Sequence, residues 1–235
     1  MFQKLMVKDL KKMVMTRTEY LLNQMATHHV PVITKKRHTY LTYHGLGETS
    51  TYILKDGIVK NSIILQDGRE FNLSYITKPD VISLLRDELS KNTAQPFNVR
   101  IESETADFYK IDRVTFWQMV NKDDELNNYV KEYYRTKLSE NIVRSQQMIM
   151  GSKHDIVCTF LKQLVDLFGK RLPDHQGILI DFVVTNMDIA GFCGINSRSS
   201  VTRILSDLRK EGIIDISDHK FVIKNLIYLR DYVPM

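Results

Sequence analysis

Three hydrophobic patterns follow one another along the chain. Apolar residues of 3–26 recur at helical spacing. From 30 to 112 apolar and polar residues alternate and β-branched residues are frequent, which predicts strands. After 112 the helical spacing returns, and two short strand-like runs interrupt it near the end. This order predicts an α+β protein with its main sheet in the first half.

The turns of the strand-rich region predict how its strands pair. Asp56-Gly57 and Asp67-Gly68 each lie between two strand-like runs. Asp-Gly is the strongest short-range signal for a hairpin with a two-residue turn. We therefore expect a hairpin at both places, within an antiparallel β-roll over 30–112.

A long amphipathic helix is expected after the roll. A short helical run follows Asp112, and Asp123 or Asp124 can cap the helix after it. Apolar residues then recur over about six turns, a length of roughly 35 Å. These residues are Leu126, Val130, Tyr133, Leu138, Ile142, Val143 and Ile149. Because they occupy more than one side of the helix, they need a partner, either the protomer's own sheet or a second protomer.

Two short helices joined by a tight turn are expected between 185 and 212. Thr185 and Asp188 can form a capping box at the start of the first helix. Gly194 tolerates positive φ and ends it, and Ser197 can cap the second helix. The second helix has one apolar stripe, formed by Val201, Ile204, Leu205 and Leu208. The stripe must face a core.

Neighbouring elements complete a winged helix-turn-helix. Gly151-Ser152 ends the long helix, and an amphipathic helix is expected over 153–169. A strand is expected over 179–183. Two further strands, joined by a turn at 217–219, form the wing, and a short helix ends the chain.

The open face of the helix after Ser197 has the composition of a nucleic-acid reader. Arginine can donate two parallel hydrogen bonds to guanine in the major groove, and short hydroxyl residues permit close approach. We assign Arg198, Ser199 and Arg203 to base edges. Positions for phosphate contacts or orientation are Thr185, Asn186, Ser197, Ser200 and Thr202, with His219 and Lys220 at the tip of the wing. The alternative is a solvated amphipathic helix without a ligand.

The residues from Arg198, RSSVTRIL followed by DLRKEGII, resemble the recognition helix and wing of the Crp/Fnr superfamily of bacterial transcription regulators. From Ile189 to Val201 the turn is one residue longer than that of the cyclic-AMP receptor protein. PrfA-like virulence regulators share this length, and the pair Gly194-Ile195. The resemblance is specific over about the last fifty residues.

This resemblance implies a domain order and a set of partners. We expect a cupin-like β-roll of the cyclic-nucleotide-binding type over 1–120, a dimerisation helix over 121–150 and a winged helix-turn-helix over 151–235. In the family the long helix forms a two-fold seam, here assigned to Leu126, Val130, Tyr133, Leu138 and Ile142. A homodimer would read a palindromic operator in double-stranded DNA. The resemblance also implies RNA polymerase as a partner.

The resemblance does not supply an effector. Cyclic-nucleotide binders carry a Gly-Glu pair and a later arginine, but 79–97 has no Gly-Glu, and Gln95-Pro96 stands near the expected arginine. Cyclic AMP is therefore disfavoured. PrfA-like members hold a thiol peptide between roll and helix, and the matching positions here are Tyr75, Ile76, Tyr129 and Tyr133. The effector, if there is one, is a small molecule of unknown identity, and core packing is the other interpretation of these aromatic residues.

Composition and charge narrow the function further. The chain has 235 residues, a net charge of +5 and two cysteines, too few for a disulfide framework or a four-cysteine iron–sulfur cluster. Residues 151–235 hold 11 Lys and Arg against 10 Asp and Glu, so the DNA-binding hypothesis depends on one helix and not on bulk charge. No apolar run is long enough for a bilayer span and no signal-peptide cleavage site follows the amphipathic start, which places the protein in the cytoplasm, away from membranes.

Three functions follow from these observations. The first is a homodimeric DNA-binding transcription regulator that is not an enzyme and has no metal site. The second is a winged helix that binds a protein instead of DNA. The third is a thiol enzyme built on Cys158 and His154, four residues apart on one helix, although no third orienting residue is evident.

Overall fold

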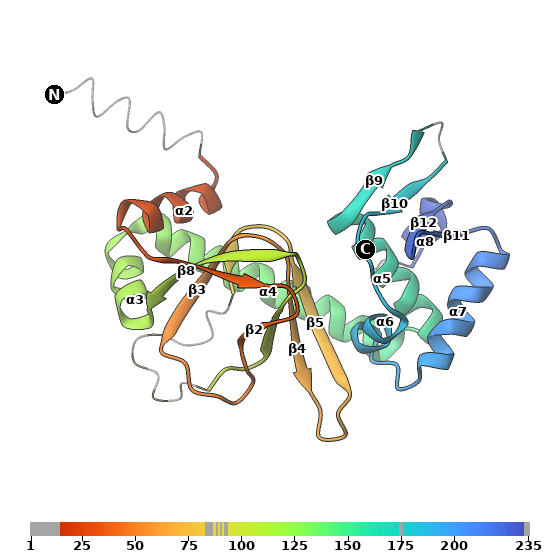
Figure 1. The fold of residues 1–235 in the computed structure, drawn as a ribbon, viewed down its shortest axis with the longest axis horizontal. Coiled ribbons are helices and arrows are strands. Elements are labelled where there is room, and N and C mark those ends of the chain that lie inside the picture. Colours follow the sequence, from red (N-terminus) through yellow and green to blue (C-terminus); the bar gives the residue numbers. More distant parts are fainter. Residues whose placement is uncertain are drawn as a thin grey trace. The chain divides into compact units, whose positions relative to one another are not determined.

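The computed structural model describes residues 15–82, 87, 89, 91, 94–173 and 176–232 (Figure 1). Contacts divide the chain into two compact units. One comprises Met1–Ile64 and Leu73–Leu138, and the other comprises Leu65–Asn72 and Ser139–Met235. The second unit therefore includes the tip of a hairpin from the first half of the sequence. The domain boundaries at 120 and 150 stay a prediction, and the first part of the helix expected over 3–26 lies outside the described residues.

Two four-stranded sheets form the predicted β-roll, in the orders β1-β8-β3-β6 and β2-β7-β4-β5. The strands of the first sheet are β1 (Val32–Lys36), β3 (Ser50–Asp56), β6 (Asp80–Val81) and β8 (Thr105–Asp112). Those of the second are β2 (Tyr40–Thr42), β4 (Val59–Ile64), β5 (Glu70–Ile76) and β7 (Asn98–Ile101). β8 pairs antiparallel with β1 and β3, and β7 pairs antiparallel with β2 and β4.

Alternation along β3 produces two cores. Tyr52 and Leu54 point to one face of their sheet and pack with Phe108, Val59 and the other residues between the two sheets. Ile53 points to the opposite face, where helices cover it. These helices are α2 (Arg17–Thr27), α3 (Arg113–Lys122) and the start of α4 (Asp124–Met150). Sheet and helices thus form layers, as the alternating pattern predicts.

One of the two expected hairpins is wrong. Asp67-Gly68 joins β4 to β5, which are neighbours in one sheet. Asp56-Gly57 joins β3 to β4, which belong to different sheets. After Gly57 the carbonyl of Ile58 accepts the N–H of Glu102 at 2.8 Å, so the chain turns toward β7 and not back along β3. The dipeptide supplied the positive φ of 108° but not the hairpin.

Local signals placed the helices of the second unit correctly. α5 (Lys153–Phe168) begins at a capping box of Ser152 and Asp155. α6 (Asn186–Cys193), α7 (Arg198–Lys210), the wing strands β11 (Ile214–Ser217) and β12 (Lys220–Ile223), and α8 (Leu226–Arg230) follow the predicted order. Between α5 and α6 the expected strand over 179–183 is shorter, β10 (Ile178–Ile180), and it pairs with β9 (Gly169–Arg171), which the sequence pattern missed.

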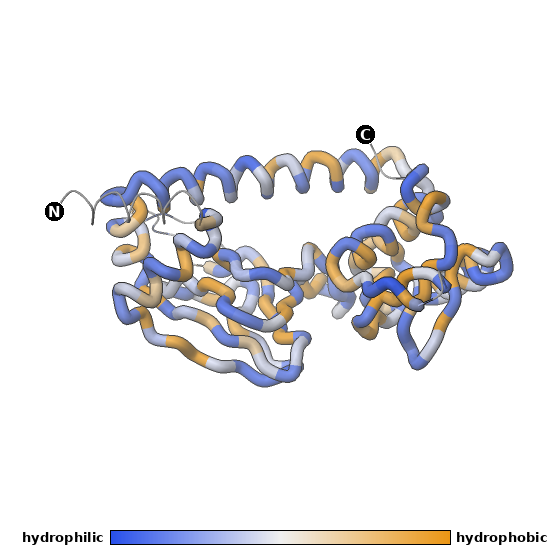
Figure 2. The backbone as a smooth tube through the Cα atoms, turned by 90° about the horizontal axis from the view of Figure 1, so that it is seen from above, coloured by the Kyte–Doolittle hydropathy of each residue, from blue (hydrophilic) through white to orange (hydrophobic). Residues whose placement is uncertain are grey.

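The long helix α4 changes its surroundings along its length. Leu126 and Val130 are buried in the core of their own unit, which leaves little of their surface for a dimer seam. Their assignment to that seam stays a prediction. Tyr133 packs against the same core. Further along, Leu138 and Ile142 are 63% and 60% exposed. Figure 2 shows hydrophobic positions recurring among hydrophilic ones along this helix. The periodicity revealed an apolar stripe, but not that the roll covers its beginning.

We expect Gly57→Ala to destabilise the roll more than Gly68→Ala. Both glycines have positive φ, which costs an L-residue about 1–2 kcal/mol. A Cβ at Gly57 would also lie 2.6 Å from the Cβ of Ala106, whereas nothing lies within 4 Å of one at Gly68. Urea unfolding followed by circular dichroism should show Gly57→Ala less stable than Gly68→Ala by roughly 1–3 kcal/mol. Equal stabilities of the two variants would contradict this account of the crossing.

Candidate nucleic-acid interface

Caps at both helices fix the turn between α6 and α7. The Thr185 hydroxyl accepts the N–H of Asp188 at 3.0 Å, and the Asp188 carboxylate accepts the N–H of Thr185 at 3.1 Å. At the other end of α6, Gly194 has φ 62° and the N–H of Ile195 donates to the carbonyl of Ala190 at 2.9 Å. Ser197 caps α7 by accepting from the N–H of Ser200. The predicted helix-turn-helix is confirmed.

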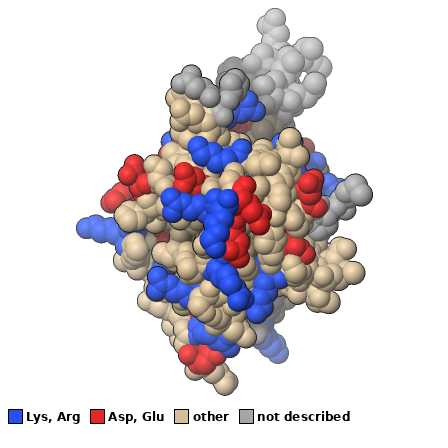
Figure 3. Space-filling view, turned by 90° about the vertical axis from the view of Figure 1, so that its right-hand side faces the viewer, with Lys and Arg blue, Asp and Glu red and all other residues tan. Residues whose placement is uncertain are grey.

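α7 has one buried and one exposed face. Val201, Leu205 and Leu208 are 5% exposed or less and pack inward. On the other face the residues assigned to bases, Arg198, Ser199 and Arg203, are exposed. They line one open surface together with Thr202, Ser206, Asp207 and Lys210. Figure 3 views the side on which α7 lies in Figure 1, where Lys and Arg gather beside a few Asp and Glu. Cationic and acidic side chains lie side by side on this face, and residues 151–235 as a whole are nearly neutral.

Hydroxyl and amide groups are ordered around the arginines. The Asn186 amide donates to the Thr202 hydroxyl at 2.9 Å, and this hydroxyl donates to the carbonyl of Arg198 at 3.0 Å. Ser197 and Ser199 hydroxyls lie 2.6 Å apart and share a hydrogen bond. The bond between Asn186 and Thr202 joins the two helices.

Of the two wing residues assigned to phosphates, His219 is exposed and Lys220 is held in an ion pair. His219 lies at the tip of the β11–β12 turn with φ 62° and is exposed. Lys220 is half-buried, and its ammonium lies 2.6 Å from the Asp181 carboxylate. Lys170 of β9 reaches the same carboxylate at 2.5 Å. Hydrogen bonds from Lys170 and Lys220 lower the pKa of Asp181 to about 2. Sequence reasoning missed Lys170 and Asp181 because β9 gave no recognisable strand signal.

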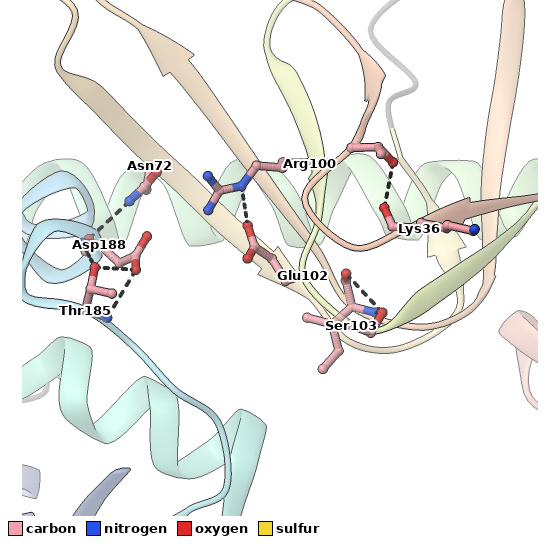
Figure 4. A network of polar contacts seen from close by, with 9 residues as sticks. Lys36, Asn72, Arg100, Glu102, Ser103, Thr185 and Asp188 are labelled. Atoms are coloured by element: carbon pink, nitrogen blue, oxygen red, sulfur yellow. Dashed lines mark hydrogen bonds and ion pairs between the residues drawn. The ribbon is translucent and has the colours of Figure 1, made fainter. Parts of the chain in front are cut away.

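A hairpin tip contributes contacts that no sequence signal indicated. The Asn72 amide at the start of β5 donates to the carbonyl of Asp188 in α6 at 3.1 Å (Figure 4). Arg69 donates to the side-chain oxygen of Asn196 in the turn before α7. These partners are more than one hundred residues apart in sequence, so only the fold brings them together.

The four residues assigned to an effector pocket do not converge. Ile76 packs between the two sheets, whereas Tyr129 and Tyr133 belong to the core on the helix side. The Tyr129 hydroxyl donates to the Asp80 carboxylate and accepts the N–H of Val81 at 3.1 Å. Tyr75 is 8% exposed. These side chains pack in the core, and an effector site built from them stays a prediction.

The cysteine environment disfavours thiol chemistry. Cys158 is fully buried and its Sγ lies 3.7 Å from His154 Nδ1. Burial raises the pKa of the Cys158 thiol to about 12, and the carboxylates of Asp155 and Glu211 add to the effect. A nucleophilic cysteine requires the opposite shift.

The described residues hold neither a cluster of metal ligands nor a membrane-spanning helix. No group of three or more His, Cys, Asp or Glu side chains in this part of the chain lies close enough together to hold a metal ion. None of its helices combines the length and hydrophobicity needed to cross a bilayer.

Comparison with known proteins decides the family. A model described as the Crp-like helix-turn-helix domain matches residues 157–232. The lactate racemization regulatory protein of Lactiplantibacillus plantarum is 65% identical over 221 residues, which cover 94% of this chain and 99% of that protein. The chain belongs to the Crp/Fnr family of transcription regulators. It is accordingly a DNA-binding regulator with an α+β fold.

More distant Crp/Fnr relatives agree with this assignment. The listeriolysin regulatory protein of Listeria monocytogenes is 28% identical over 183 residues, covering 77% of this chain and 76% of that protein. A Crp-family transcriptional regulator from Thermus thermophilus has the same fold, with a TM-score of 0.70 and 21% identity over 86% of this chain and 96% of that one.

We expect Asp181→Asn to strengthen the salt dependence of DNA binding. The Asp181 carboxylate holds Lys170 and Lys220, and its removal leaves both cations free to meet phosphates. Each new phosphate contact adds about 0.9 to the slope of log affinity against log salt. Titrations of duplex DNA at several salt concentrations should show a slope steeper by about 1–2. Asp166→Asn, which removes an exposed carboxylate of α5 from an ion pair with Lys162, is the control. An unchanged slope in Asp181→Asn would show that Lys170 and Lys220 stay away from DNA.

Proposed function

We propose that this protein is a homodimeric transcription regulator whose two α7 helices read a palindromic operator through the major groove. The observation that carries the proposal is the exposed face of α7, where Arg198, Ser199 and Arg203 are held on a rigid, doubly capped scaffold. Arginine is the side chain best suited to guanine. Thr185, Asn186, Ser197, Ser200 and Thr202 serve phosphates or orientation, with His219 and Lys220 at the wing.

The second half of α4 supports the dimer. Leu138, Ile142 and Ile149 are 63%, 60% and 82% exposed in the protomer, and their spacings of four and seven residues place them on one face. Large apolar side chains in such a row favour pairing with the same row of a second protomer. Two recognition helices about 34 Å apart then reach two half-sites one helical turn apart.

The 65% identical relative suggests the target genes. That protein is a lactate racemization regulatory protein, and the similarity extends over nearly its whole length. We infer that this protein likewise controls genes of lactate racemization, together with RNA polymerase and in the cytoplasm. The burial of Cys158 and the raised pKa of its thiol argue against the thiol-enzyme alternative. A small-molecule effector other than cyclic AMP stays part of the proposal without an assigned site.

Selection of bound sequences from a random duplex pool tests this function. The expected product is a palindrome bound by a species with twice the protomer mass. Binding should weaken steeply between about 50 and 200 mM salt, because lysine and arginine release condensed counterions. A monomer that selects no sequence, or an affinity insensitive to salt, would support the protein-binding alternative.

Arg203→Ala should weaken binding to the selected palindrome by about 1–3 kcal/mol, because one bidentate base contact is lost. The fold should be unaffected, since Arg203 is exposed. Gel-shift titration gives the affinity, and circular dichroism checks the fold. Arg230→Ala in α8 removes an exposed arginine away from α7 and should bind like the unmodified protein. Unchanged affinity in Arg203→Ala would remove this residue from the interface.

Ile142→Glu should separate the dimer, because it places like charges directly opposite each other in the proposed seam. Thr136→Glu is the matched control, since it adds the same charge to an exposed position on another face of α4. Sedimentation equilibrium should show a loss of at least tenfold in dimerisation affinity for Ile142→Glu alone. If both variants remain dimers, the seam lies elsewhere.

A further inference from the structure

Arg144 lies on the face of α4 opposite its exposed apolar row. It follows Ile142 by two residues, which corresponds to about 200° around a helix. Ile142 is 60% exposed, whereas the Arg144 side chain is partly buried. One segment of helix thus has an apolar side toward solvent and a cationic side toward its own unit.

The Arg144 guanidinium joins three parts of that unit. Its Nη2 donates to the carbonyl of Asn72 in the hairpin at 2.5 Å and to the carbonyl of Phe192 in α6 at 3.1 Å. The guanidinium carbon lies 5.1 Å from the centre of the Phe71 ring, a cation–π distance. Helix α4, helix α6 and the tip of the β4–β5 hairpin are therefore held by one side chain.

Arg144 binds the C-terminal end of α6, where backbone carbonyls lack partners within the helix. Phe192 is the penultimate residue of α6, and the last four carbonyls of a helix have no partner within the helix. A cation at this end also interacts favourably with the helix dipole. One turn further along α4, the methyl group of Met148 would lie 3.1 Å from a Cβ at Gly194, so α4 follows the end of α6 closely. α6 is fixed at the end from which the chain turns into α7.

Gly191 permits the close approach of the β4–β5 hairpin to α6. A Cβ at Gly191 would lie 2.6 Å from the Asn72 amide nitrogen and 2.7 Å from the carbonyl oxygen of Glu70. Glycine within a helix is less stable than alanine by roughly 0.5–1 kcal/mol. α6 therefore gives up intrinsic helix stability at a position where the hairpin approaches its backbone.

We propose that Arg144 is a positioning residue that fixes the helix-turn-helix to the dimerisation helix and so sets the distance between the two recognition helices. The inference rests on the proposed dimer through α4. A dimer reads two half-sites together only if each recognition helix keeps a constant position relative to the seam. Arg144 provides this constraint because the apolar row and the anchor of α6 are opposite faces of the same three turns of helix.

The test compares DNA probes that differ in half-site spacing. The probes are the palindrome obtained by selection, versions with one or two base pairs added or removed at its centre, and a duplex with a single half-site. One base pair rotates a half-site by about 35°. The unmodified protein should bind one spacing best. Arg144→Met, which keeps the length and apolar stem of the side chain, should bind the palindrome about tenfold more weakly, bind the half-site within about twofold of normal and show a flatter dependence on spacing.

Three further variants make the result specific. Arg135→Met removes an exposed arginine of the same helix and should keep the normal spacing profile. Arg144→Lys keeps the charge but not the planar group that bridges two carbonyls, so it should flatten the spacing profile like Arg144→Met. It replaces Arg144→Met in the test if that variant does not fold. Gly191→Ala should do the same while leaving α6 helical, because it separates the hairpin from α6.

A spacing profile of folded Arg144→Met and Arg144→Lys that matches the unmodified protein would overturn the inference. Failure of the proposed function would look different from failure of the role of Arg144. In the first case the unmodified protein itself would be a monomer or would bind all spacings alike. A loss of half-site binding equal to the loss on the palindrome would also overturn it, because Arg144 would then support the recognition helix itself and not its position.

Discussion

The burial of one stripe of α7 determines what the C-terminal unit presents to its surroundings. Val201, Leu205 and Leu208 each gain about 1.5–3 kcal/mol from leaving water. A rotation of α7 by one residue, about 100°, would expose part of this stripe and turn polar side chains such as Thr202 and Arg209 toward the core. The rotational setting of the helix is therefore strongly fixed. The face with the arginine and hydroxyl side chains points toward solvent because the opposite, apolar face must stay buried.

Helix α4 shows how one regular element serves different purposes along its 27 residues. Its first turns pack under the roll through Leu126 and Val130. Its later turns leave Leu138 and Ile142 exposed, with Arg144 on the other side. Within these later turns the helix keeps Ile142 and Arg144 on opposite sides, since each residue adds 1.5 Å and 100°. Flexible loops could not maintain such a relation.

The sequence predicted best what depends on neighbouring residues. The capping box of Thr185 and Asp188, the cap at Ser197 and the break at Gly151-Ser152 involve groups within a few residues of each other, and all were placed correctly. The Asp56-Gly57 turn failed as a hairpin because the dipeptide specifies a backbone conformation and not the next partner strand.

Contacts between distant segments were beyond the sequence pattern. Periodicity identified the apolar residues of α4 but could not show that the roll covers Leu126 while Ile142 stays exposed. In the candidate interface, the side chains of α7 were found from spacing and chemistry. The ion pair of Lys220 with Asp181 and the bonds of Arg144 to two carbonyls were not, because they join residues 39 or more positions apart.

If two copies of the chain pair through the exposed row on α4, as proposed, the concentration of the protein itself affects how much of it is paired. In a single protomer Leu138 and Ile142 are exposed to water. Pairing would remove this apolar surface from water, which is favourable. By mass action, a twofold rise in scarce protomers then raises the population of pairs about fourfold. A cell that varies synthesis of this chain modestly would obtain a steeper change at its promoters, before any metabolite takes part.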